Sequence, residues 1–413
     1  MEKKPLISKV EAQAFSPTSP TKKSSWFARA WDFVSSSIVG IVFGFALEKA
    51  KVYLPSVIVR QMQWTELTML VVFLTATLAG MLTIATLESL KQFKRCPKPP
   101  LGLFEGATLL GKYGNNIIGG ALVGVGMSLA GACPGTVLVQ LGAGVPTAPY
   151  VFVGALGGAV SFGYIHKATK AAVKSFGAKK PVEVVDGKHA AYLTIAIIAG
   201  LVGFPVMWFL NCNIPWRSDM WQDAIKDFNI SKMTKIANPF LAVGNLDFSV
   251  TLPAWSPFTA GLGIGLAQFL SILLTDSVIG ASSVYPYIGS VIVSTFDQKW
   301  ETNVPFYKDY ASLWTSSIFA VGMTVGSFLS VTGSGLSYGS EIASSTGTSV
   351  ISAALATRLV LGGISLVYGS RIAGGCTSGH GISGMSQLSV ASVITVAAMF
   401  GGGTAVALLV GEL

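Results

Sequence analysis

The sequence has little charge. Only 11% of its 413 residues are Asp, Glu, Lys or Arg, whereas 51% are hydrophobic, and the mean hydropathy is +0.61. A water-soluble chain of this length needs roughly a quarter of charged residues to cover its surface. The low charge therefore excludes a string of soluble domains and predicts one continuous domain embedded in a lipid bilayer.

Cysteine and histidine are also scarce, with four and three residues respectively. No two cysteines form a CxxC pair, so the sequence predicts neither a disulfide framework nor a metal site, and we expect no cofactor. The net charge of +9 comes from Lys and Arg in the loops between apolar runs. That distribution is typical of membrane proteins and argues against nucleic acid as a partner.

Nine apolar windows are long enough to cross a bilayer, since a span needs about 20 residues. They cover residues 33–59, 66–90, 114–132, 148–166, 190–210, 258–280, 310–331, 350–372 and 390–410. Two shorter, interrupted stretches at 134–145 and 377–389 each follow a cysteine, and 282–296 is a third candidate. Irregular backbone at membrane depth is tolerated only inside protein or beside a cavity. The sequence thus predicts an all-α polytopic membrane protein with about nine spans and two or more re-entrant half-helices.

The chain contains an internal repeat. Residues 119–135 read GGALVGVGMSLAGACPG and residues 362–379 read GGISLVYGSRIAGGCTSG, which aligns Cys133 with Cys376. An odd number of crossings separates the copies, so the repeat is inverted, as in many secondary transporters. We expect a disordered tail at 1–30, a first membrane repeat at 31–180, a linking span and outside loop at 181–257, and a second repeat at 258–413. Basic loops after the second and fourth windows place the N-terminus in the cytosol, and a plasma membrane is favoured over an organelle.

Each repeat carries a turn in which a long helix ends in glycine, a cysteine follows and a short helix begins. First-turn N–H groups of a short helix can hold an anion without a full positive charge. A thiol adds a polarizable sulfur and a weak donor, which favours a soft, sulfur-bearing anion. The alternatives are that both cysteines are small apolar fillers, or that one is a reactive thiolate. The candidate pathway residues here are Gly131, Cys133, Pro134, Gly135 and Thr136, and Gly375, Cys376, Thr377, Ser378 and His380.

These motifs resemble a known family. GGCTSGHGISGMSQLS at 374–389, preceded by GSRIA, together with GACPG at 131–135, resembles the YeeE/YedE sulfur-transport family over about residues 38–410. The resemblance implies a membrane-embedded inverted repeat and a central constriction at which cysteine thiols pass thiosulfate along. Cys133 and Cys376 match two of the family's cysteines, whereas Tyr53 stands at the position of a further one.

Other polar residues near the predicted spans have two interpretations each. Gln268 either lines the pathway or bridges helices. Arg371 either attracts anions or reaches the headgroups or an acidic partner. His380 either donates to the anion, with a pH-sensitive charge, or bonds a carbonyl that holds the turn. Glu48 and its neighbouring lysines are expected where the first span meets water, and no pair of intramembrane carboxylates indicates a proton relay.

The sequence predicts a permease for thiosulfate rather than an enzyme. The alternatives are a membrane sulfur-relay enzyme that forms a persulfide on Cys133 or Cys376, and a transporter of a different sulfur or selenium oxyanion. A cytosolic sulfur-transfer enzyme is a candidate partner.

Overall fold

The computed structural model describes residues 26–97, 113–174, 189–227, 239–334 and 351–410. Within these ranges every regular element is a helix, and eight of the helices are long and apolar enough to cross a membrane. They are α2 (Trp26–Lys49), α4 (Thr68–Ser89), α7 (Ala148–Lys174), α8 (His189–Asn213), α10 (Pro257–Thr275), α13 (Trp314–Gly333), α15 (Ala353–Ala373) and α17 (Val390–Val410). Together with the shorter apolar helix α5 (Gly114–Ala130), they confirm the prediction of an all-α polytopic membrane protein.

The remaining elements are short. They are α3 (Pro55–Met62), α6 (Thr136–Ala143), α9 (Trp216–Asp227), η3 (Pro239–Ala242), η4 (Ala281–Ser283), α11 (Val284–Phe296), α12 (Trp300–Asn303), η5 (Pro305–Asp309), η6 (Thr377–Ile382) and α16 (Ser383–Ser386). Four of them lie in the interrupted stretches: α6 in 134–145, α11 in the candidate stretch 282–296, and η6 and α16 in 377–389.

The first predicted span, 33–59, is wrong as a single helix. Helix α2 ends at Lys49. Two residues later Lys51 adopts a left-handed conformation with φ of 55°, and α3 begins at Pro55. A residue before proline is pushed out of the helical region, and Leu54 is accordingly extended. The helix also begins earlier than expected, at Trp26, so only residues 1–25 of the predicted tail lie outside the described residues.

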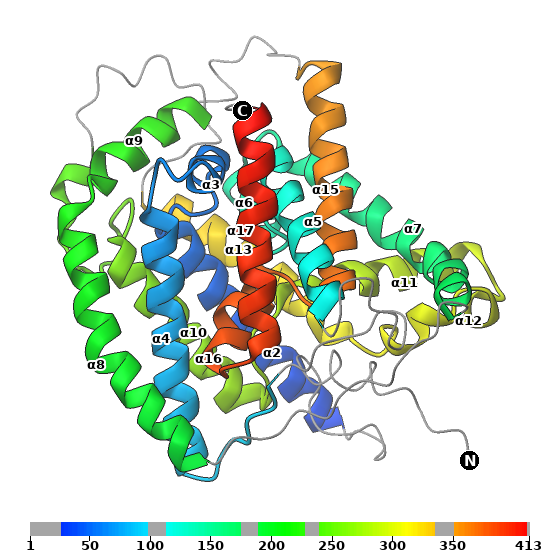
Figure 1. Ribbon diagram of the computed structural model, residues 1–413, viewed down its shortest axis with the longest axis horizontal. Helices are drawn as coiled ribbons and strands as arrows, with labels where there is room; N and C mark the ends of the chain where they lie inside the picture. Colours follow the sequence, from blue (N-terminus) through cyan, green and yellow to red (C-terminus); the bar gives the residue numbers. More distant parts are fainter. Residues whose placement is uncertain (1–25, 98–112, 175–188, 228–238, 335–350, 411–413) are drawn as a thin grey trace.

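The two halves of the chain pack in a matching pattern. Helix α2 packs against α13 and α10 packs against α4, while α17 lies on α5 and α7 lies on α15. At the centre α5 packs against α15, as Figure 1 shows. An inverted repeat predicts such paired contacts. The repeat limits at 31–180 and 258–413 stay predictions.

Glycines let the central helices approach closely. A Cβ atom on Gly124 of α5 would collide with the carbonyl of Met399 on α17, and one on Gly154 of α7 would collide with the carbonyl of Val360 on α15. Such contact between backbones requires the smallest side chain.

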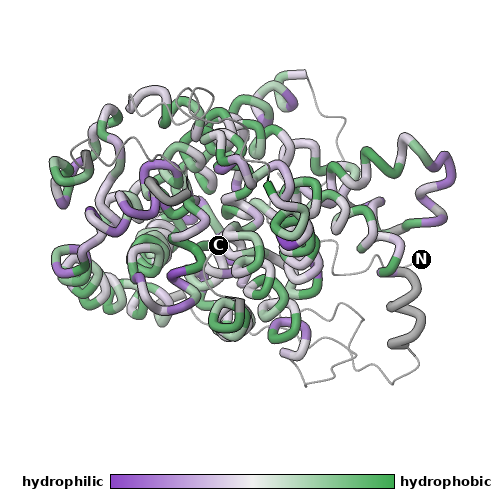
Figure 2. Tube along the Cα trace, turned by 90° about the horizontal axis from the view of Figure 1, so that it is seen from above, coloured by the Kyte–Doolittle hydropathy of each residue, from purple (hydrophilic) through white to green (hydrophobic). Residues whose placement is uncertain are grey.

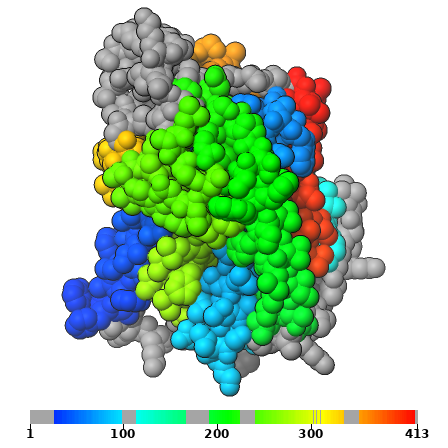
Figure 3. Space-filling view, turned by 90° about the vertical axis from the view of Figure 1, so that its left-hand side faces the viewer, coloured from blue at the N-terminus to red at the C-terminus, as the bar shows by residue number. Residues whose placement is uncertain are grey.

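Helix α8 lies at the edge of the bundle. Only 17% of its apolar stretch is buried, against 61% for α10, and Leu201 and Phe209 are exposed. Figure 3 shows α8 in green along one whole face, and α9 lies over one end of the bundle in Figure 1. Seen from above in Figure 2, most turns of the bundle are hydrophobic or neutral. The exposed apolar side chains of α8 suit contact with lipid tails.

Candidate functional site

Both central helices end in the same way, on a left-handed glycine. Gly131 has φ of 57° and its N–H donates to the carbonyl of Met127, which closes α5. Gly374 has φ of 77° and its N–H donates to the carbonyl of Ser370, which closes α15. Glycine adopts this conformation without the penalty that a Cβ atom adds. The predicted succession of helix, glycine and cysteine is confirmed in both halves.

The first turn is held by a reciprocal pair of hydrogen bonds between Cys133 and Thr136. The Cys133 N–H donates to Thr136 Oγ1 at 2.7 Å, and the Thr136 N–H donates to Cys133 Sγ at 3.4 Å. The reciprocal bonds resemble a capping box, but they lie just before α6, whose N-cap residue is Gly135 and has no side-chain cap. Accepting the bond uses a lone pair of the sulfur and not its S–H group.

The first-turn amides of α6 are the groups that the sequence predicts to hold an anion, but residues just before the helix already supply acceptors to three of them. The Thr136 N–H bonds the Cys133 sulfur, the Val137 N–H donates to the Cys133 carbonyl at 3.1 Å, and the Leu138 N–H donates to the Gly135 carbonyl at 3.2 Å. The tight turn that contains Pro134 brings acceptors within reach of these donors. The side chains, more than the helix end, therefore define the polar character of this turn.

The second turn differs from the expected capped α-helix. Residues 377–382 form a π-helical turn, and its N-cap residue is Cys376, without a side-chain cap. Ser378 Oγ lies 3.2 Å from Cys376 Sγ and accepts a bond from the N–H of Ala281 at 3.3 Å. Ser378 therefore ties the thiol to the break between α10 and α11 instead of capping the helix. Gly381 sits where a Cβ atom would collide with the ring of Phe73.

The two turns meet inside the protein. The Cys133 thiol interacts with the side chain of Thr377 and electrostatically with Cys376. Thr377 Oγ1 is buried and forms no hydrogen bond of good geometry within the described chain. Only 7% of Cys133 and 0% of Cys376 is exposed. Two thiols from opposite halves of the chain and the Thr377 hydroxyl thus share a buried site.

Tyr285 of α11 completes this site. It interacts electrostatically with both cysteines, and its hydroxyl donates to the Pro134 carbonyl at 2.6 Å. The apolar pattern of 282–296 indicates a buried segment, but it does not distinguish Tyr285 from the other aromatic residues there. Sequence reasoning therefore missed this residue.

Two glutamines brace the turns. Gln140 of α6 donates through Nε2 to the Tyr53 carbonyl at 2.7 Å and to the Gly131 carbonyl at 2.8 Å. Gln268 of α10 accepts from the Ile279 N–H at 3.2 Å and from the Ser383 hydroxyl at 3.1 Å. Gln268 therefore bridges α10 to the segment before η4 and to α16, which is one of its two expected roles. Sequence reasoning missed Gln140, although it lies seven positions after Cys133 in the predicted half-helix at 134–145.

Tyr53 reaches the first turn through its backbone. Its carbonyl accepts the bond from Gln140, while its hydroxyl lies 3.4 Å from Glu48 Oε1, away from that contact. The Tyr53 side chain is fully buried.

His380 and Arg371 both have partners near the second turn. His380 Nε2 lies 3.1 Å from the Ala373 carbonyl and Nδ1 lies 3.0 Å from Ser392 Oγ. Because a carbonyl can only accept, Nε2 carries a proton, and His380 has the contacts of a residue that holds the turn. Arg371 is buried and donates to the Tyr310 hydroxyl at 3.1 Å, so it does not reach the headgroups.

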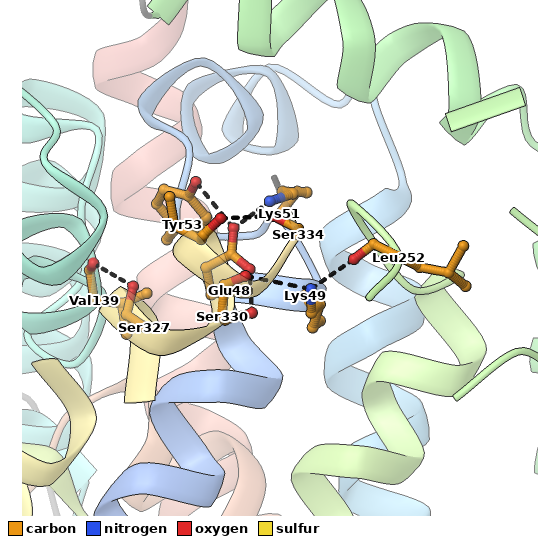
Figure 4. A network of polar contacts seen from close by, with 10 residues as sticks. Glu48, Lys49, Lys51, Tyr53, Val139, Leu252, Ser327, Ser330 and Ser334 are labelled. Atoms are coloured by element: carbon orange, nitrogen blue, oxygen red, sulfur yellow. Dashed lines mark hydrogen bonds and ion pairs between the residues drawn. The ribbon is translucent and has the colours of Figure 1, made fainter. Parts of the chain in front are cut away.

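The charged residues at the end of α2 are buried, which corrects the expectation that they meet water. Glu48, Lys49 and Lys51 are all 0% exposed. Glu48 pairs with Lys51 and accepts from the Ser330 hydroxyl, and Lys49 Nζ donates to the Leu252 carbonyl at 2.5 Å (Figure 4). The segment before α10 folds over this end of α2 and excludes water from it. We call these three charged residues the α2 charge cluster.

A second charged group lies where α9 meets the α3–α4 connection. Glu66 and Asp223 are 3% and 2% exposed, and Arg60 Nη1 donates to Asp223 Oδ1 at 3.0 Å. The pKa of Glu66 is raised to about 8, chiefly by burial and then by the Asp223 carboxylate beside it. Glu66 and Asp223 are 157 positions apart, so no local pattern in the sequence indicates the pair.

A model of the family described as sulphur transport matches residues 49–405. This chain belongs to the sulphur transport family. A protein named probable transporter, from Xylella fastidiosa (strain Temecula1 / ATCC 700964), is similar to this chain: it is 26% identical over 157 residues, which are 38% of this chain and 95% of that relative. Family membership and the apolar helices establish a multi-pass integral membrane protein, and its class is a membrane transporter.

Proposed function

We propose that this member of the sulphur transport family carries thiosulfate across the bilayer, and that the anion passes between the Cys133 and Cys376 turns. The observation that carries the proposal is the meeting of two buried thiols from opposite halves of the chain. Cys133 and Cys376 match two cysteines of the family that the sequence resembles, and the matched family transports sulphur. Both observations support a sulfur-bearing anion as the substrate. The runner-up within this class is another sulfur or selenium oxyanion.

The chemistry of the site suits weak, repeated binding. Thiols and hydroxyls donate to an anion without the full charge of a lysine or arginine, and an anion held this way can leave again. Thr377 supplies a buried hydroxyl beside the Cys133 thiol, whereas the Tyr285 hydroxyl already donates to the Pro134 carbonyl and holds the turn in place. A terminal sulfur is larger and more polarizable than an oxygen, so thiols contact it more favourably than they contact sulfate. Among the candidate pathway residues, the proposal takes Cys133, Cys376 and Thr377 as the contacts with the anion. The frame consists of Gly131, Pro134, Gly135, Thr136, Gly375 and Ser378, and the candidates that surround or brace it are Tyr53, Gln268, Arg371 and His380.

The expected topology indicates which side of the protein faces the cytosol. The basic loops after the second and fourth windows predict a cytosolic N-terminus, so uptake runs toward that side. A plasma membrane and a cytosolic sulfur-transfer enzyme that consumes the anion belong to the same proposal.

Uptake by purified protein in liposomes tests the proposal. The wild type should accumulate labelled thiosulfate, and Cys133→Ala and Cys376→Ala should each lower the rate at least tenfold. The double variant Cys96→Ala/Cys212→Ala is the matched control, since both of these cysteines are exposed, and it should transport normally. A panel of sulfate, sulfite and selenate as competitors identifies the preferred oxyanion.

Two outcomes would contradict thiosulfate transport. Normal uptake in both variants of the buried cysteines would remove the thiols from the pathway. Consumption of thiosulfate in detergent, with a stable mass increase of one sulfur on Cys133 or Cys376, would instead establish the sulfur-relay enzyme. That enzyme needs a base beside a thiolate, and the ring nitrogens of His380 already contact Ser392 and Ala373.

A further inference from the structure

A small cavity of about 10 Å³, which is room for roughly one water molecule, lies between α3, α4, α5 and α17, next to the second turn. Its wall includes four methionines together with Phe73 and Thr377, and the methionines are Met62, Met69, Met127 and Met399. The chain has 11 methionines in all, so more than a third of them gather around this one space. No charged side chain lines the pocket.

The pocket adjoins the site of the two thiols at Thr377. Thr377 belongs to the pocket wall and also interacts with the Cys133 thiol. Met127 lies in the last turn of α5, where its carbonyl accepts the N–H of Gly131 at the start of the cysteine turn. Anything that reaches Cys133 from this pocket therefore passes Thr377 and the methionines around it.

The methionines are packed closely enough to close this route. Met62, Met127 and Met399 are 1%, 0% and 2% exposed. Methionine is unbranched and has three rotatable bonds, so it can fill a gap and swing aside without movement of its helix. An apolar constriction of this kind expels water and blocks hydrated ions. A strongly hydrated oxyanion loses more on entering such a space than a weakly hydrated one.

We propose that Met62, Met69, Met127 and Met399 form the gate on the α3 side of the thiols and determine specificity for anions that end in sulfur. The inference rests on the proposed thiosulfate pathway, and the gate is the entrance to that pathway. The thioether sulfurs contact the polarizable terminal sulfur of the anion as their side chains rotate. Sulfate presents only hydrated oxygens to this surface and is rejected there.

Accessibility of Cys133 tests the gate without any transport measurement. The protein carries Cys96→Ser, Cys212→Ser and Cys376→Ser, and a membrane-impermeant anionic methanethiosulfonate modifies Cys133 in detergent. We expect Met62→Ala/Met399→Ala to speed the modification at least tenfold. Met81→Ala, which removes a buried methionine of α4 outside the pocket, should leave the rate unchanged. If the double variant does not fold, each single variant should still show at least a threefold increase.

Leucine variants test specificity. Met62→Leu and Met399→Leu keep the volume and remove the sulfur, so the modification rate of Cys133 should stay at the wild-type value. The preference for thiosulfate over sulfate in liposomes should fall at least fivefold. An unchanged modification rate in the alanine variants overturns the gate, and an unchanged preference in the leucine variants overturns its role in specificity. Failure of the wild type to take up thiosulfate would sink the proposed function alone, because the accessibility measurement would still report on the gate.

Discussion

The hydroxyl of Tyr285 donates a hydrogen bond of 2.6 Å to the carbonyl of Pro134. Tyr285 lies in the first turn of α11, in the second half of the chain, whereas Pro134 follows the cysteine of the first half. The bond therefore fastens the first cysteine turn to an element of the other repeat. A shift of α11 would move this turn, so the spacing of the two thiols depends on how the halves pack.

Replacing Tyr285 by Phe should disturb this fastening. The change leaves the Pro134 carbonyl buried without its donor, and a lost hydrogen bond of this kind costs about 1 kcal/mol, or up to about 3 where desolvation is complete. We expect a lower unfolding temperature in detergent and a severalfold lower rate of thiosulfate uptake. Tyr287→Phe is the matched control on the same helix, since Tyr287 is only half-buried. Equal behaviour of the two variants would show that the bond contributes nothing.

Gln140 should contribute to the stability of the protein and to the position of the first cysteine turn. Gln140→Leu removes the donor to the Tyr53 and Gly131 carbonyls and leaves both without that bond, at a cost of about 1–3 kcal/mol for each buried group. The free energy of unfolding should fall accordingly, and modification of Cys133 by a thiol reagent should become faster. Gln92→Leu, at an exposed position, should change neither. A Gln140→Leu variant with wild-type thiol reactivity would mean that the brace does not position the turn.

Stability should decrease as the pH rises, because of Glu66. Its pKa is about 8 in the folded protein against an ordinary value of 4.5, so the folded state retains a proton that the unfolded chain releases. This contribution is fully present below about pH 4.5 and is lost as the pH rises through 8. Glu66→Gln should flatten the unfolding temperature between pH 5 and pH 9. Glu301→Gln, in an exposed pair with Lys308, should leave the slope as in the wild type. A slope that survives in Glu66→Gln would assign the pH dependence to another group.

The α2 charge cluster should tolerate the loss of a whole ion pair better than the loss of one partner. Glu48→Gln leaves the lysines buried without their carboxylate, and breaking a buried pair typically costs about 3–5 kcal/mol. Glu48→Leu/Lys51→Met removes both partners and should recover much of that loss. A double-mutant cycle on the free energy of unfolding measures the coupling. Additive effects of the two single changes would show that Glu48 and Lys51 do not depend on each other.

Much of the fold can be predicted because membrane helices depend on local composition. The apolar windows locate α4, α5, α7, α8, α10, α13, α15 and α17, since a span needs only length and hydropathy. The first window fails because a run of apolar residues does not register the break at Lys51 and Pro55. The positions of both cysteine turns follow from local rules, because a left-handed glycine stops a helix wherever it stands.

The composition and spacing of this sequence determined a membrane-embedded helical protein with two glycine–cysteine turns. Only the tertiary structure decided that Tyr285 and Thr377 stand beside the thiols, that Cys133 and Thr136 exchange two hydrogen bonds, and that four methionines gather beside Thr377. The physical reason is that hydropathy and backbone conformation act over a few neighbouring residues. Contacts between groups more than a hundred positions apart depend on how the two halves pack, and no short pattern in the chain encodes that packing.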